Sequence, residues 1–120
     1  LARENVRRQG LGGRVIVREG DLLEPVPGCV DLVVANLPYL PARERGRHAD
    51  LAGEPAEAVF AARDGLGPYR RLLGACETRL TSGGALVIQF RGRVYAARRD
   101  ELGVLRDRLE DEATLALEAA

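Results

Sequence analysis

Two runs of almost uninterrupted apolar residues constrain the fold of this chain more than any other feature. They are CVDLVVAN at 29–36 and ALVIQF at 85–90. Each has the length of a strand, and a strand without polar alternation is typical of a sheet that is covered on both faces. Helical spacing appears in the segments around them. Strands that alternate with helices predict an α/β domain with a mainly parallel sheet.

The chain before the first run predicts one helix and one strand. LARENVRRQG reads as the end of a helix that stops at Gly10, because glycine readily adopts the left-handed conformation that closes a helix. RVIVREGD (14–21) is predicted to be a short strand built on Val15 and Val17. Asp21, at its end, is interpreted either as a turn residue or as a hydrogen-bond acceptor for a ligand.

The second half of the chain predicts two helices around the strand at 85–90. The first begins near Pro68, since proline is favoured in a first helical turn. TSGG (81–84) is expected to end it. Its apolar stripe consists of Leu72, Leu73, Cys76 and Leu80. The second helix is predicted from about Tyr95, and the pattern after Phe90 indicates no final hairpin of strands. The apolar residues of this second helix are Leu102, Leu105 and Leu109.

Composition limits the class of protein. The 120 residues suffice for one modest domain, of which 46% are apolar and 30% charged. No apolar run reaches the roughly 18 residues of a membrane span, and the start lacks the apolar stretch of a signal peptide. All 18 basic residues are arginines, balanced by 18 acids, so a nucleic-acid partner is not expected from charge. A cytoplasmic protein is predicted.

The cysteines and the single histidine indicate no metal site. Cys29 and Cys76 show no Cys-x-x-Cys spacing and are interpreted as small core residues of a reduced protein. His48 is the only histidine. A histidine-based zinc site or a Ser-His-Asp triad is therefore not expected.

The segment ANLPYLP (35–41) carries the most specific chemical signal. The side-chain oxygen of Asn36 can accept one N–H of a bound NH₂ group, and the main-chain carbonyl of Leu37 can accept the other. Pro38 favours extended geometry at the residue before it, which aims that carbonyl. Tyr39 offers a flat face to a planar amide or base. The alternative is a rigid turn in which Asn36 hydrogen-bonds its own backbone. The loop 37–63 that follows is long enough to be functional.

Three segments extend this signal into a family resemblance. GDLLEPVPGCVDLVVANLPY, EPAEAVFAARDGLGPYRRLL and SGGALVIQF resemble, in this order, the HemK-like enzymes that methylate a glutamine of peptide-chain release factors. These enzymes fall within the class I S-adenosylmethionine-dependent methyltransferases. The resemblance covers roughly residues 2–90 and implies a Rossmann-like sheet with strand order 3-2-1-4-5. It also implies that residues 1–120 form a partial, C-terminal part of the domain, without the glycine-rich cofactor loop and the first two strands.

The resemblance implies specific residue roles. Asn36 and the Leu37 carbonyl would hold the substrate nitrogen, with Pro38 and Tyr39 completing the catalytic motif. Asp21, Leu22 and Asn36 would contact the cofactor, S-adenosylmethionine. Leu37 stands where the family usually has proline, which reduces rigidity more than it alters a role that belongs to a carbonyl.

The implied function is methylation of a glutamine side-chain amide in a release factor, with an upstream segment or a partner chain completing the sheet. Two alternatives remain. One is an adenine N-methyltransferase acting on RNA or DNA, in which Asn36 and its neighbours would grip a base. The other is a non-catalytic methyltransferase remnant or binding module.

Overall fold

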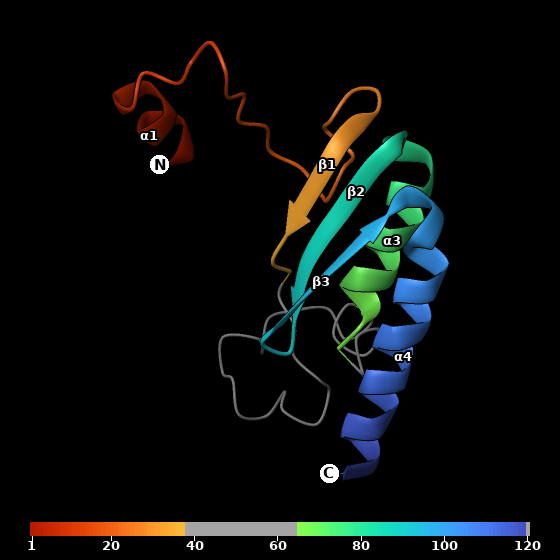
Figure 1. The fold of residues 1–120 in the computed structure, drawn as a ribbon. Coiled ribbons are helices and arrows are strands. Elements are labelled where there is room, and N and C mark those ends of the chain that lie inside the picture. The colour runs from red at the N-terminus through yellow and green to blue at the C-terminus, as the bar shows by residue number, and fades with distance from the viewer. Residues whose placement is uncertain (38–64, 120) are drawn as a thin grey trace.

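A computed structural model describes residues 1–37 and 65–119. Three strands form one sheet in the order β1-β2-β3, and two long helices lie on one side of it (Figure 1). The elements are α1 (Ala2–Arg8), β1 (Val30–Ala35), α3 (Gly67–Arg79), β2 (Leu80–Phe90), β3 (Arg93–Arg98), the 3-10 helix η3 (Arg99–Glu101) and α4 (Leu102–Ala119). The predicted α/β class is confirmed in its coarse form, as a mixed sheet with helices.

The central strand, β2, pairs with a parallel neighbour on one side and an antiparallel neighbour on the other. Its regular register with β1 runs from Leu32↔Ala85 to Ala35↔Ile88. The two predicted apolar strands are therefore adjacent and parallel, as expected. TSGG (81–84) belongs to β2 as an irregular segment rather than ending the helix. Gly84 fits closely there, because a Cβ would lie 3.0 Å from the Thr81 carbonyl oxygen and would force that neighbour to shift.

The core lies between the sheet and the helices α3 and α4. Alternate residues of a strand point to opposite faces, so each strand contributes every second side chain to this layer. The residues of the apolar stripes predicted for the two helices are confirmed as buried, although Leu80 is the first residue of β2 and not part of the helix. The core consists of Val33, Leu66, Tyr69, Leu72, Leu73, Cys76, Leu80, Leu86, Ile88, Phe90, Tyr95, Ala97, Leu102, Leu105, Leu109 and Ala113.

The opposite face of the sheet is apolar and open. Val34 is 70% exposed and Val94 71% exposed, and Leu32 lies on the same face. Only Val33 of β1 is buried. The expectation that the 29–36 strand is covered on both faces is therefore wrong for the residues that the structure describes, because both packed helices lie on one side.

A hairpin joins β2 to β3, which the sequence pattern did not indicate. Phe90 pairs with Arg93, and the two turn residues Arg91 and Gly92 have φ values of +53° and +79°. Positive φ at both positions defines the tight turn that matches the twist of paired strands. Arg-Gly lacks the usual Asn-Gly signal, and the alanines of RVYAAR favour a helix by propensity. Pairing with β2 prevails, so the helix begins at Leu102 and not near Tyr95.

The N-terminal helix ends as predicted. Gly10 adopts a φ of +69°. The N–H of Leu11 donates to the Val6 carbonyl at 2.9 Å, and the N–H of Gly10 donates to the Arg7 carbonyl at 3.1 Å. This pair of bonds is the glycine-terminated Schellman motif. The helix lies apart from the sheet and buries none of its residues (Figure 1).

The predicted strand at 14–21 is absent. This segment forms no ladder with β1, β2 or β3, and Ile16 is 75% exposed. In the expected strand order it would be the third strand, separated from the fourth by two others. Because a strand is defined by the neighbours that bind its N–H and C=O groups, an isolated extended segment does not become one.

The segment before β1 is fastened to the end of α3 by one arginine. Arg79 donates from Nε to the Gly28 carbonyl at 2.8 Å and from Nη1 to the Leu23 carbonyl at 3.1 Å. Cys29 is exposed, and its Sγ lies 3.6 Å from the Thr78 carbonyl oxygen. The prediction of a core position is thus wrong for Cys29, which precedes the strand, and confirmed for buried Cys76.

Two buried groups make the stability of this fold sensitive to alkali. Burial raises the pKa of the Cys76 thiol above its ordinary 9.0. Burial, and then the hydrogen bond and charge of Glu112, raise the pKa of Tyr95 above its ordinary 10.0, although Arg93 opposes this. Above these values the unfolded chain loses each proton before the folded chain does. The free energy of unfolding is therefore expected to fall as the pH rises past about 9.

Urea unfolding over a series of alkaline pH values tests this prediction. Cys76→Ala should remove the part of the decline that begins near pH 9.0. Tyr95→Phe should remove the part that begins near pH 10.0. An identical pH dependence in the parent and both variants would contradict the assignment.

Candidate active site

A cavity of about 520 Å³ lies where β1 and β2 end. Its size falls within the range of small-molecule sites. In open parallel sheets, ligands bind beyond the carboxyl ends of the strands, and this cavity has that position. It is lined by Asn36, Leu37, Tyr69, Gln89, Arg91 and Gly92.

Asn36 faces this cavity directly after β1. The last ladder pair, Ala35↔Ile88, places Asn36 and Gln89 at neighbouring positions of adjacent strands. Both side chains are exposed, on the sheet face that the helices leave open. Among the described residues, the Asn36 carboxamide makes no hydrogen bond, including to its own backbone. Its oxygen is therefore available to accept an N–H from a ligand.

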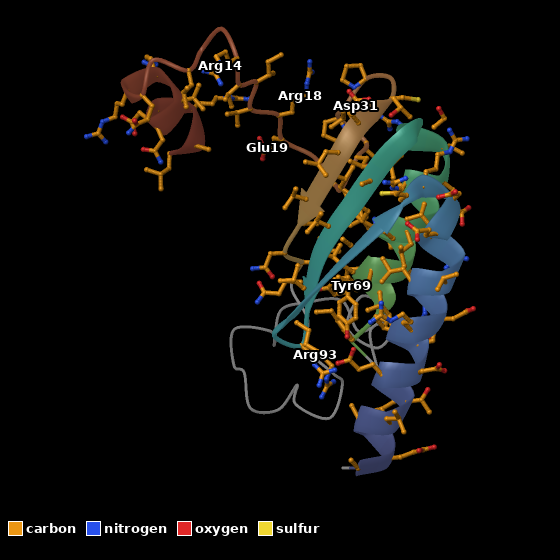
Figure 2. The ribbon with its side chains drawn as sticks, in the orientation of Figure 1. Arg14, Arg18, Glu19, Asp31, Tyr69 and Arg93 are labelled. Carbon is orange, nitrogen blue, oxygen red and sulfur yellow. The ribbon has the colours of Figure 1, made fainter. Side chains whose placement is uncertain are left out.

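The carbonyl of Leu37 is held by a tyrosine that the sequence reading did not single out. The Tyr69 hydroxyl lies 3.2 Å from the Leu37 carbonyl oxygen and 2.5 Å from the Gln89 carbonyl oxygen. Figure 2 shows Tyr69 at the hairpin end of the sheet, near Arg93. The hydroxyl thus joins the chain after β1 to the end of β2. A tyrosine just after Pro68 in an otherwise leucine-rich helix was the available signal.

The other two predicted cofactor residues lie in a separate place. Asp21 and Leu22 line a cavity of about 260 Å³ against α3. The Asp21 carboxylate forms an ion pair with Arg71, and both side chains are more than half exposed. The structure does not bring Asp21 together with Asn36, because the strand that would carry Asp21 to the same edge does not form. Pro38 and Tyr39 lie outside the described residues.

The described residues offer no metal site and no membrane span. No group of three or more histidine, cysteine, aspartate or glutamate side chains gathers in residues 1–37 and 65–119. No helix in the same ranges is long and apolar enough to cross a bilayer. The lining of the larger cavity offers hydrogen-bond acceptors, among them the Asn36 carboxamide oxygen, together with donors such as the Arg91 guanidinium. Such an acceptor suits a ligand that presents an NH₂ group.

Comparison with known proteins finds similarity to methyltransferases. A release factor glutamine methyltransferase of Moorella thermoacetica is 42% identical over 92 residues, which cover 75% of this chain and 32% of the relative. A ribosomal protein uL3 glutamine methyltransferase of Bordetella pertussis is 34% identical over 92 residues, with 75% and 31% covered. A 4-amino-L-phenylalanine/4-methylamino-L-phenylalanine methyltransferase of Streptomyces pristinaespiralis is 36% identical over 92 residues, with 73% and 30% covered.

The resemblance to release factor glutamine methyltransferases that the sequence motifs indicated is therefore confirmed. The chain spans about a third of the length of these relatives. No family model matches the chain. No solved structure matches it either.

Proposed function

We propose that this chain contributes to an S-adenosylmethionine-dependent N-methyltransferase that methylates the side-chain amide of a glutamine in a peptide-chain release factor. The observation that carries the proposal is the position of Asn36 and Leu37, which line one cavity at the carboxyl end of β1. The similarity to enzymes named glutamine methyltransferases supports the same reaction. A release-factor substrate also implies a cytoplasmic enzyme.

The two acceptors address the chemical difficulty of the reaction. An amide nitrogen is a poor nucleophile because its lone pair is delocalised into the carbonyl. Asn36 Oδ1 would accept one N–H and the Leu37 carbonyl the other, which orients the nitrogen and favours the positive charge that develops on it. Bound S-adenosylmethionine would supply the methyl group. One N–H proton would then leave to water, so no histidine or cysteine base is needed.

The cofactor site would need more than the described residues supply. Asn36 lines the larger cavity, whereas Asp21 and Leu22 line the smaller one. The proposed cofactor roles of all three residues therefore require a rearranged Asp21 segment. We infer that an upstream segment or a partner chain adds strands to the edge of β1 that no described residue pairs, since an edge strand leaves backbone groups unpaired.

The competing functions are less well supported. An adenine methyltransferase acting on RNA or DNA is disfavoured by the zero formal net charge and by the names of the relatives. A small aromatic amine is a second candidate substrate, because one relative is named for 4-amino-L-phenylalanine. A non-catalytic remnant would bind no S-adenosylmethionine.

Methyl transfer to a panel of acceptors tests the proposal. The full-length gene product is incubated with S-adenosylmethionine and a release factor, ribosomal protein uL3, 4-amino-L-phenylalanine or RNA, and the products are analysed by mass spectrometry. We expect one methyl group on a release-factor glutamine, and none when that glutamine is replaced by glutamate. Methylation of another acceptor in preference to the release factor would contradict the proposed substrate.

Tyr39 is predicted to act through its ring. Tyr39→Phe keeps the flat face and should leave turnover nearly unchanged. Tyr39→Ala removes it and should lower turnover about tenfold, the scale of one aromatic contact. Steady-state rates of both variants with the release factor provide the measurement. If both substitutions lowered turnover by the same factor, the role would belong to the Tyr39 hydroxyl and not to its ring.

A further inference from the structure

We propose that Tyr69 is a positioning residue of this site: its hydroxyl fixes the Leu37 carbonyl in the orientation that receives the substrate amide. The inference rests on the proposed function, in which that carbonyl accepts one of the two amide N–H groups. It adds a residue from a different element, the first turn of α3, to a motif that otherwise consists of consecutive residues after β1.

The orientation of the Leu37 carbonyl is not set by pairing within the sheet. The parallel ladder ends at Ala35↔Ile88, two residues before Leu37. Past this point no strand neighbour fixes the direction of the backbone. The Tyr69 hydroxyl lies 3.2 Å from the Leu37 carbonyl oxygen and is the hydrogen-bond donor that the structure records there. It also lies 2.5 Å from the carbonyl oxygen of Gln89, in the neighbouring strand. A hydroxyl carries one proton, so this proton is shared between the two carbonyl oxygens, with Gln89 the nearer acceptor. The shared hydroxyl joins the chain at Leu37 to β2.

Tyr69 is itself rigidly held. Its side chain is only 1% exposed. Its ring meets Phe90 edge to face, with centroids 5.0 Å apart and an interplanar angle of 72°. The next residue, Arg70, binds Glu110 of α4 through two hydrogen bonds, Nε–Oε1 at 2.6 Å and Nη2–Oε2 at 2.8 Å. Because these two bonds hold the first turn of α3 against α4, the position of the Tyr69 hydroxyl beside the Leu37 carbonyl is well defined.

The arrangement leaves the carbonyl able to bind substrate. A carbonyl oxygen has two lone pairs, so the bond from Tyr69 leaves one free for an amide N–H. Donation from the hydroxyl does not make this oxygen a better acceptor for a second donor. The contribution of Tyr69 is therefore one of orientation, which matters most where the reacting nitrogen must be aligned with the methyl donor.

A matched pair of tyrosine variants isolates this contribution. Tyr69→Phe removes the hydroxyl and keeps the ring against Phe90. Tyr95→Phe is the control: Tyr95 is also buried and also donates its hydroxyl, to Glu112, but it does not line the cavity. Both variants are made in the full-length gene product and assayed by single turnover with the release factor.

Tyr69→Phe is expected to lower the methyl-transfer rate about threefold to tenfold, the equivalent of one lost hydrogen bond. Affinity for S-adenosylmethionine should stay within about twofold, since the cofactor contact of Asn36 is unchanged. Tyr95→Phe should leave the rate at the parent value. A structural readout accompanies the kinetics: the ¹³C carbonyl resonance of Leu37 should move in Tyr69→Phe and not in Tyr95→Phe.

The results of these assays distinguish failure of the Tyr69 positioning role from failure of the proposed function. If the parent methylates the release factor and Tyr69→Phe does so equally fast, the positioning role is wrong and the proposed function stands. If both variants slow the reaction equally, Tyr69 acts only through general stability, and the positioning role is again wrong. If the parent methylates no release factor, the proposed function falls and the inference with it.

A variant that keeps the hydroxyl covers the case in which Tyr69→Phe does not fold. Site-specific 3-fluorotyrosine at position 69 retains ring and hydroxyl but makes the hydroxyl a stronger donor. The Leu37 carbonyl resonance and the methyl-transfer rate should then both change. A parent-like resonance and rate would overturn the positioning role.

Discussion

Replacing Asn36 with alanine is expected to lower the rate of methyl transfer about 10²–10³-fold, the scale of one oriented polar group lost from an active site. The structure supports so large an effect because Asn36 is exposed to a cavity of about 520 Å³ and is not used for internal hydrogen bonding among the described residues. Without Asn36 Oδ1, one amide N–H of the substrate has no acceptor. The nitrogen is then neither oriented nor relieved of its developing charge.

The matched control for this variant is Asn5→Ala. Asn5 also presents an exposed carboxamide, but it lies in α1 and does not line the cavity. No role in the site is proposed for Asn5, so the rate of this variant should remain near that of the parent. Single-turnover rates with the release factor and calorimetric affinities for S-adenosylmethionine should be measured for both variants. A rate within about threefold of the parent for Asn36→Ala would refute the amide-binding role, given the size of effect expected for such a group.

The parts of the fold that the sequence predicted are those with local causes. Pro68 and the leucines that follow it indicate α3 by themselves, and Gly10 ends α1 through its own backbone freedom. The hairpin after Phe90 was missed because its turn residues, Arg91 and Gly92, give only half of the usual signal. There the pairing of β3 with β2 decides the structure.

The apolar run of β1 was interpreted correctly as a strand and incorrectly as one covered on both faces. Its composition suits burial of Leu32 and Val34, but the described helices cover only the face of Val33. The chain spans about a third of the length of its relatives. We infer that the composition of β1 is matched to a second layer contributed by a segment or chain beyond these three strands.

The site shows the same division between local and tertiary causes. The position of Asn36 was predictable, because a residue directly after a parallel strand lies at the edge where ligands bind. Asp21 lies away from that edge, against α3, because the strand predicted before it needs neighbours in order to form. Tyr69 was missed because its partners, the carbonyls of Leu37 and Gln89, are 32 and 20 residues away in the chain. No periodicity in the sequence indicates such contacts.

The 120-residue chain by itself is expected to bind S-adenosylmethionine weakly or not at all. The residues proposed to contact the cofactor are divided between two cavities. Asp21 is paired with Arg71 in the smaller one, and Asn36 lines the larger one. A ligand that requires both groups gains at most part of its contacts from either cavity.

The sheet gives a second reason for weak binding. If the family strand order applies, two strands belong between the 14–18 segment and β1, a span of roughly 10 Å at about 4.8 Å per strand. Without them, the 14–18 segment forms no ladder, and Asp21 is not carried to the edge where Asn36 lies. Within residues 1–37 and 65–119, one edge of β1 has no partner, and such an edge favours pairing with another chain.

Titration calorimetry on the isolated chain, with the longer Moorella thermoacetica relative as the positive control, measures this difference. We expect the isolated chain to bind at least about 100-fold more weakly than the relative, which corresponds to the loss of roughly 2.7 kcal/mol of binding free energy. Sedimentation in the same buffer reports whether the chain is monomeric. Micromolar binding by a monomer would show that the described residues can close a cofactor site without further strands, and the inferred need for an added segment would be wrong.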